Sequence, residues 1–156
     1  MTNKCCEILA KNKLTITFIE SASAGYLAYR FSLSPCSGKI LNGGLVCYDL
    51  KIKEKILKIS PKLIEKYTPE SMEVTEELVK KSKAIFKSDI YVGCTGLLKR
   101  GGSETPEKPV GTFFYSISYK NKIYSYRCLC KGNKKKKLNT LIRYICKSLI
   151  KIIKSK

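Results

Sequence analysis

The chain has 156 residues, of which 31 are lysine or arginine and 12 are aspartate or glutamate, so its formal net charge is +19. It contains eight cysteines but no histidine, which excludes Ser-His-Asp triads, Cys-His dyads, histidine-ligated zinc and imidazole acid–base catalysis. The length suits a single domain over residues 1–156, and a hydrophobic content of 44% is enough to build a core.

The basic residues are unevenly distributed along the chain. Residues 1–98 carry 15 basic and ten acidic residues, whereas residues 99–156 carry 16 basic and two acidic ones, so the net charges are +5 and +14. This basic half is compatible with an anion-binding face or with the solvated surface of a lysine-rich protein. No pattern of interleaved aromatic and basic residues accompanies the charge, so we do not expect nucleic acid as a partner.

The cysteine spacing and the lengths of the apolar runs indicate the cellular compartment in which the protein is expected. No two cysteines form a Cys-x-x-Cys pair, so neither a zinc knuckle nor a thioredoxin-like site is expected. Residues 1–13 lack the apolar segment of a secretory signal, and no apolar run approaches the ~20 residues that span a membrane. We therefore expect a cytoplasmic protein with reduced, mostly buried thiols and no membrane partner.

The N-terminal segments follow a helix–strand–helix pattern. Apolar residues at helical spacing predict a short helix over Asn3–Lys13, and the β-branched and aromatic run Leu14–Ile19 predicts a buried strand. A cluster of small residues follows and leads into a helix over Tyr26–Phe31. We therefore expect Ser21 and Ser23 on a strand-to-helix turn, at a helix N-terminus.

The next five segments are a loop, a strand and three helices. The strand contains a Gly-Gly pair, which indicates a close backbone approach, and the second helix opens with a Ser-Pro cap signal. In chain order we expect these segments over Pro35–Lys39, Ile40–Tyr48, Lys51–Ile59, Pro61–Tyr67 and Met72–Phe86.

The last part of the chain predicts a strand, a Gly/Pro-rich loop, a hairpin, a basic turn and a closing helix. Helices that alternate with apolar strands favour a three-layer α/β/α domain with a mixed, mostly parallel sheet of about five strands. The segments are Asp89–Cys94, Thr95–Pro109, Val110–Tyr119 with Lys122–Cys130, Gly132–Lys136 and Leu138–Ile153.

Three segments together resemble a known family. Residues 20–25 read E-S-A-S-A-G and resemble an E-S-x-T-G-G turn, and residues 43–53 read G-G-L-V-C-Y-D-L-K-I-K and resemble G-G-V-V-x-Y-x-N-x-x-K. Residues 95–112, which end in K-P-V-G-T, resemble T-G-I-A-G-P-x-G-G-x-x-x-K-P-V-G-T. In this order and spacing they resemble the CinA C-terminal domain family, the nicotinamide mononucleotide (NMN) amidohydrolases, over roughly residues 5–153.

This resemblance implies a reaction and a set of site residues. The family reaction converts NMN to nicotinate mononucleotide and ammonia in pyridine-nucleotide salvage, and it implies a stand-alone deamidase domain here. By motif position, Ser21 would be the nucleophile, Lys53 its general base, and Tyr48 would assist the dyad or orient the substrate. No metal or cofactor is implied, NMN is the expected partner, and a homo-oligomer is left open. The implied substrate-binding residues are Ser23, Ala24, Gly25, Gly44, Thr95, Gly96 and Lys134.

The chemistry of these residue types is consistent with that resemblance. A serine hydroxyl is a weak nucleophile that needs a neighbouring base, and without histidine a neutral lysine amine is the natural candidate. If residues 51–55 open a helix, Lys53 can point inward while Lys51 and Lys55 remain in water. Backbone N–H groups after Ser21 would supply an oxyanion hole or bind the 5′-phosphate, and the sequence leaves both open.

Some residues depart from the family pattern, which keeps other functions open. Ala24 replaces a glycine, Leu50 replaces an asparagine, and Leu97-Leu98-Lys99-Arg100 replaces I-A-G-P, so a flexible loop becomes bulky and cationic. One alternative is therefore a degenerate homologue that binds a nucleotide or a protein without turnover. The other alternative is a basic nucleic-acid-binding accessory protein. Without the resemblance, Ser21 would be interpreted first as a helix cap.

Overall fold

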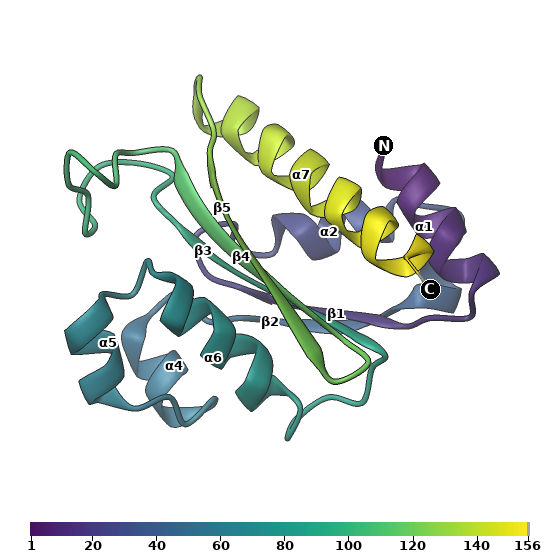
Figure 1. Cartoon of the computed structure of the whole chain (residues 1–156), viewed down its shortest axis with the longest axis horizontal. Helices are drawn as coiled ribbons and strands as arrows, with labels where there is room; N and C mark the ends of the chain where they lie inside the picture. The colour runs from purple at the N-terminus through teal and green to yellow at the C-terminus, as the bar shows by residue number, and fades with distance from the viewer. Residues whose placement is uncertain (156) are drawn as a thin grey trace.

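A five-stranded mixed sheet lies between two layers of helices in the computed structural model, which describes residues 1–155 (Figure 1). Strand β1 pairs in parallel with both of its neighbours, while β4 is antiparallel to both of its own, so four of the five strands share one direction. The predicted α/β class with a mixed sheet is thus confirmed. In spatial order the strands are β2 (Leu41–Val46), β1 (Ile16–Glu20), β3 (Ile90–Gly96), β4 (Thr112–Tyr119) and β5 (Lys122–Leu129).

The helices divide between the two faces of this sheet (Figure 1). The long closing helix packs against the N-terminal helix and β4, and the helix before β3 packs against β3 and β4 from the opposite side. One layer contains α1 (Thr2–Lys11), α2 (Tyr26–Ser32), α3 (Ser37–Ile40) and α7 (Lys134–Lys154), and the other contains α4 (Leu50–Lys55), α5 (Pro61–Tyr67) and α6 (Met72–Ser82).

Side chains of β1 point alternately into two hydrophobic clusters. Phe18 belongs to the cluster under α2 and α7, where its ring meets Phe31 edge to face at 4.8 Å, and Ile19 belongs to the cluster under α6. Because both faces of the strand are covered, its apolar residues Ile16, Phe18 and Ile19 do not alternate with exposed ones. Every residue of β1 is buried, including Thr17 and Glu20.

Several predicted boundaries were wrong. The expected loop over Pro35–Lys39 contains the start of the single helical turn α3, which begins at Ser37. The Ser37 amide donates to the Ser34 carbonyl, and the Lys39 amide donates to the Cys36 carbonyl. The expected basic turn over Gly132–Lys136 is instead largely the first turn of α7, since the side chain of Asn133 accepts a hydrogen bond from the Lys136 amide and caps the helix. Helix α6 ends at Ser82 and not at Phe86.

The carboxyl ends of the three parallel strands β2, β1 and β3 bring the proposed motifs together. The Ser21 amide, directly after β1, donates to the Cys94 carbonyl of β3 at 3.0 Å. On the other side, the Cys47 amide, directly after β2, donates to the Glu20 carbonyl at 2.8 Å. The segments that follow β1, β2 and β3 therefore leave the sheet as neighbours, which is the usual place for a site in an α/β fold.

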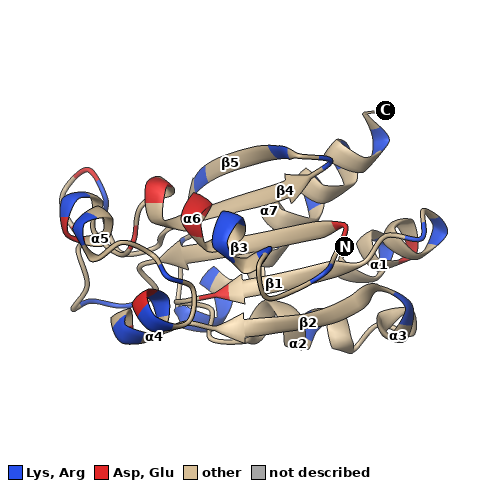
Figure 2. Cartoon of the chain, turned by 90° about the horizontal axis from the view of Figure 1, so that it is seen from below, with Lys and Arg blue, Asp and Glu red and all other residues tan. Residues whose placement is uncertain are grey.

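Charge is spread over the surface without much pairing. Figure 2 shows basic residues scattered over helices, loops and β5, with acidic segments on α4, α5 and α6 among others. Within residues 1–155, salt bridges form only between Lys80 and its helix neighbours Glu76 and Glu77. All eight cysteines are free thiols. In the same residues, no helix combines the length and the apolar character needed to cross a membrane.

Candidate active site

A cavity of about 230 Å³ opens where the segments after β1, β2 and β3 meet. Its wall is formed by the turn after β1, the start of α4, the turn between α5 and α6, and the loop after β3. The lining residues are Ser21, Ala22, Tyr48, Leu50, Lys53, Pro69, Glu70 and Gly96 to Gly102.

Ser21 and Lys53 meet at the base of this cavity, where the Lys53 Nζ lies 3.0 Å from the Ser21 Oγ. Lys53 is 1% exposed, although Lys51 and Lys55 on the same helix are exposed. Helix α4 is fixed at its start because the Asp49 side chain accepts a hydrogen bond from the Lys51 amide at 2.7 Å. This cap sets the rotation of the helix and directs Lys53 inward.

The other partners of Lys53 are backbone carbonyls. The Nζ donates to the Cys47 carbonyl at 2.6 Å and to the Tyr48 carbonyl at 3.2 Å. Carbonyl oxygens only accept, whereas the Ser21 hydroxyl can donate as well as accept. A neutral amine in this position gives its two N–H groups to the carbonyls and aims its lone pair at the Ser21 hydroxyl proton. The arrangement is therefore that of a base poised against a nucleophile.

Burial also favours the neutral amine. Removal from water lowers the pKa of Lys53, while Cys47, Glu70 and Asp49 act in the opposite direction and raise it. No carboxylate among residues 1–155 lies within 4.0 Å of the Nζ, so the charged form has no ion-pair partner. A lysine that is both buried and unpaired is the form expected of a general base.

The amides at the start of α2 already have a partner. The buried Glu20 carboxylate accepts hydrogen bonds from the amides of Gly25 at 3.0 Å, Leu27 at 3.1 Å and Ala28 at 2.8 Å. These amides are therefore engaged within the protein, and neither an oxyanion nor a phosphate can take them without displacing Glu20. The charge at this helix N-terminus is balanced internally.

Two amides of the turn remain without a partner. The Ser21 amide donates to the Cys94 carbonyl and the Ala24 amide donates to the Ser21 carbonyl, whereas the amides of Ala22 and Ser23 have no acceptor among residues 1–155. They directly follow the candidate nucleophile, and Ala22 lines the cavity. This position matches that of oxyanion-hole donors in acyl-transfer enzymes.

The remaining residues implied by the resemblance are divided between the cavity wall and its support. Tyr48 lines the cavity with a side chain that is 57% exposed, and Gly96 lines it from the end of β3. Thr95 is buried behind the wall, where its hydroxyl lies 2.9 Å from the Thr75 hydroxyl. Gly44 lies within β2 beside the Phe18 carbonyl and outside the lining.

The turn residues and the basic residue of α7 lie outside the lining. Ser23 is buried, and both Ala24 and Gly25 have positive φ angles, 47° and 91°. Lys134 lies at the start of α7, where it lines a neighbouring hollow together with Lys99 and Arg100. The loop over residues 97–100 therefore separates Lys134 from the cavity that contains Ser21 and Lys53.

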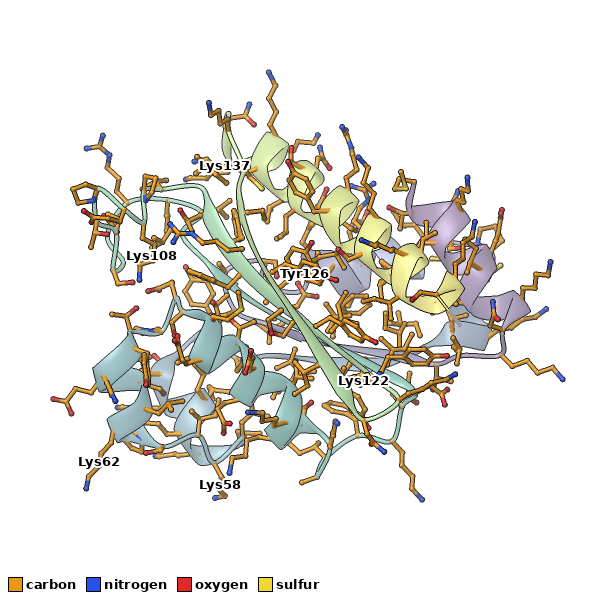
Figure 3. All side chains as sticks on the ribbon, in the orientation of Figure 1. Lys58, Lys62, Lys108, Lys122, Tyr126 and Lys137 are labelled. Carbon is orange, nitrogen blue, oxygen red and sulfur yellow. The ribbon has the colours of Figure 1, made fainter. Side chains whose placement is uncertain are left out.

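Sequence reasoning missed Glu70 and the lysine that fixes its surroundings. Lys108 lies on the loop after β3 (Figure 3). Its Nζ donates to the Thr68 hydroxyl at 2.8 Å, the Glu70 carbonyl at 2.9 Å and the Ser103 hydroxyl at 2.8 Å. Thr68 has a φ of 71° and a ψ of 156°, a conformation that costs a residue other than glycine about 1–3 kcal/mol. We call these four residues, Thr68, Glu70, Ser103 and Lys108, the clamp. The signals in the sequence were a Thr-Pro-Glu-Ser turn before a helix for Glu70 and the K-P-V-G-T motif, which begins at Lys108.

Comparison with known proteins identifies the family. A sequence model described as the CinA C-terminal domain matches residues 1–153. The chain belongs to the CinA C-terminal domain family. It is 33% identical to a CinA-like protein of Fervidobacterium nodosum over 88% of this chain and 34% of that protein. It is 31% identical to a competence-damage inducible protein of Thermoanaerobacter pseudethanolicus over 83% of this chain and 31% of that protein. The chain thus spans about a third of the length of these curated relatives.

Solved structures of the CinA superfamily share this fold. A protein from Enterobacter cloacae superposes with a TM-score of 0.89 at 20% identity, covering 98% of this chain and 92% of that one. A protein from Escherichia coli superposes with a TM-score of 0.88 at 24% identity, covering 97% of this chain and 87% of that one. At these identities the agreement concerns the CinA fold.

Proposed function

We propose that this CinA-family chain is an amidohydrolase that converts NMN and water to nicotinate mononucleotide and ammonia, in pyridine-nucleotide salvage. The observation that carries the proposal is the 3.0 Å contact between the Ser21 Oγ and the buried, unpaired Lys53 Nζ. The resemblance of the three motifs to NMN amidohydrolases supplies the substrate. We retain as predictions a single domain over residues 1–156 and a cytoplasmic location, and we leave a homo-oligomer open.

The proposed reaction has two halves. Neutral Lys53 takes the Ser21 hydroxyl proton while the Oγ attacks the amide carbon, and the Ala22 and Ser23 amides stabilise the oxyanion. The protonated Lys53 then gives its proton to the departing nitrogen, so ammonia leaves and an acyl ester remains on Ser21. Water attacks this ester with Lys53 again as the base, which releases the carboxylic acid and restores the Ser21 hydroxyl.

The other residues implied by the resemblance receive supporting roles in this proposal. The exposed Tyr48 ring is placed to cover the bound substrate at the cavity mouth, while its carbonyl holds Lys53. Ser23, Ala24, Gly25 and Gly44 shape the turn and strand behind Ser21, and Gly96 forms part of the cavity wall. Thr95 acts through its bond to Thr75, and Lys134 with Lys99 and Arg100 provides positive charge for the phosphate.

The test is ammonia release from NMN by the purified chain and by three variants. Ser21→Ala and Lys53→Gln are expected to lose activity, the lysine variant by roughly 10²- to 10⁴-fold because it removes the acid–base group. Lys51→Gln is the matched control, since it removes an exposed lysine from the same helix, and it should keep the wild-type rate. Equal rates in all four proteins would contradict Ser-Lys catalysis.

A degenerate homologue that binds nucleotide without turnover is the second candidate. It is favoured by the Leu97-Leu98-Lys99-Arg100 segment, which lines the cavity where the family pattern has I-A-G-P. Calorimetry of NMN binding, run beside the ammonia assay, separates the two candidates. Binding without product supports the degenerate homologue, and turnover that depends on Ser21 excludes it.

A further inference from the structure

The Glu70 carboxylate is an unpaired negative charge on the cavity wall of a strongly basic protein. In the described part of the chain, Glu70 is the only acidic residue that lines the cavity. No lysine or arginine nitrogen there lies within 4.0 Å of its carboxylate oxygens. The amine of Lys108 donates to the Glu70 carbonyl and not to its carboxylate. The charges of Lys53 and Lys108 act on this carboxylate, but neither amine forms an ion pair with it, so it is available to a ligand.

Within the clamp, Ser103 holds one oxygen of the Glu70 carboxylate. The Ser103 hydroxyl donates to the Glu70 Oε2 at 2.5 Å, and Lys108 fixes Ser103 and the Glu70 backbone from behind. The other oxygen, Oε1, has no hydrogen-bond partner among residues 1–155 and lies near Gly102, another residue of the lining. An oriented carboxylate with one free oxygen is a specific recognition element because its position is set before the ligand binds.

The charges of the cavity match a ligand with both signs of charge. Glu70 lines the same cavity as Ser21 and Lys53, and its charge raises the pKa of Lys53, so the carboxylate shares the cavity with the candidate nucleophile and base. Lys99 and Arg100 supply positive charge elsewhere in the same lining. The nicotinamide ring of NMN is a pyridinium cation beside the carboxamide, and its phosphate is an anion. Free nicotinamide and reduced NMN have neutral rings.

We propose that Glu70 is a specificity-determining residue that recognises the cationic pyridinium ring next to the scissile amide. The inference rests on the proposed function and extends it, because it states which chemical feature of the substrate the cavity selects. Discrimination arises from the difference between a charged and a neutral ring on the same ribose phosphate. Ser103 and Lys108 act as positioning residues for the carboxylate.

The experiment compares the affinities of NMN and reduced NMN by calorimetry. It uses the Ser21→Ala chain so that neither ligand is consumed, and it compares this chain with the Ser21→Ala/Glu70→Gln chain. The first should bind NMN roughly five- to tenfold more tightly than reduced NMN, as one partly screened charge pair allows. The second should bind the two ligands within about twofold. The ratio cancels the effect of Glu70 on the phosphate, which both ligands share.

Two further variants make the result specific. Glu65→Gln in the Ser21→Ala background removes the same charge from an exposed site on α5, so the ratio should not change. Ser103→Ala in that background removes the hydrogen bond to Oε2, and the ratio should fall part of the way. This variant also carries the test if Glu70→Gln does not fold, as judged by its thermal melting curve.

The outcomes separate this inference from the proposed function. An unchanged ratio in the Glu70→Gln chain, or equal affinities in the Ser21→Ala chain, overturns the role of Glu70 even if the wild-type chain releases ammonia from NMN. Failure of the wild-type chain to bind or hydrolyse NMN overturns both. A ratio that depends on Glu70 and Ser103 supports pyridinium recognition whatever the rate of turnover.

Discussion

The Glu20 carboxylate accepts a hydrogen bond of 2.8 Å from the amide of Ala28, which lies eight residues later and within the first turn of α2. The same carboxylate takes the amides of Gly25 and Leu27, so a single side chain fastens the turn that carries Ser21 to the helix that follows. The acidic residue at the start of the E-S motif is thus structural, because it determines where the serine points.

We expect Glu20→Gln to destabilise the fold by about 2 kcal/mol, because it replaces charge-assisted hydrogen bonds to buried amides with weaker neutral ones. Denaturant unfolding measures this loss. Glu7→Gln, on the exposed side of α1, is the control and should change stability by no more than about 0.5 kcal/mol. A Glu20 variant as stable as this control would show that the cap contributes nothing.

The midpoint of the acidic limb of the pH–rate profile should report the pKa of Lys53. The reaction needs the neutral amine, so the rate rises as pH increases through the pKa of Lys53, which burial has lowered. Asp49 raises that pKa, so Asp49→Asn should move the acidic limb to lower pH while the amide oxygen keeps the cap on α4. Glu54→Gln removes a charge from the same helix and should leave the limb in place. A limb that stays still, or moves to higher pH, in Asp49→Asn contradicts Lys53 as the base.

Replacement by alanine should be far more damaging at Gly96, in the cavity wall, than at Gly38 in α3. A Cβ added at Gly96 would lie 2.2 Å from the Phe113 ring, so Gly96→Ala should cost about 1–3 kcal/mol of stability and reduce turnover. Gly38, in α3, has nothing within 4 Å of such an atom, and Gly38→Ala should stabilise the protein by about 0.5–1 kcal/mol. Thermal melting of the two variants checks the expected loss of stability in Gly96→Ala and the expected gain in Gly38→Ala.

The clamp should protect the loop after β3 from proteolysis. Lys108→Met removes the amine that ties this loop to the turn before α6, so trypsin should cleave after the exposed Lys99 and Arg100 several-fold faster. Mass spectrometry of timed digests identifies the cleaved bonds. Lys131→Met, an exposed lysine outside the loop, serves as the control. Equal cleavage rates would indicate that the loop is held by other contacts.

The order of elements was predictable from the sequence because hydrophobic periodicity reflects burial. The run Leu14–Ile19 predicts a strand covered on both faces, and β1 is buried throughout. Boundaries were less predictable where a side chain decides them locally. Asn133 starts α7 several residues before the apolar pattern begins, since a cap needs one acceptor and no hydrophobic residue.

The site was only partly predictable for a similar reason. The family resemblance implied that Ser21 and Lys53 act together, and Lys53 faces inward although Ile52 and Ile56 beside it are exposed. Periodicity alone favours the opposite rotation of that helix. Glu70 and Lys108 come from turns and loops whose positions depend on hydrogen bonds between distant segments, which no local pattern records.

The strand order β2-β1-β3 has a consequence for how the protein acquires its site. The Ser21 amide is held by the Cys94 carbonyl, so the nucleophile is fixed only after two segments more than 70 residues apart have paired in parallel. Closing such a long loop is slow compared with forming the β4–β5 hairpin or a single helix. The turn that carries Ser21 should therefore be among the last parts to become ordered during refolding, and regain of activity should lag behind regain of helical circular dichroism.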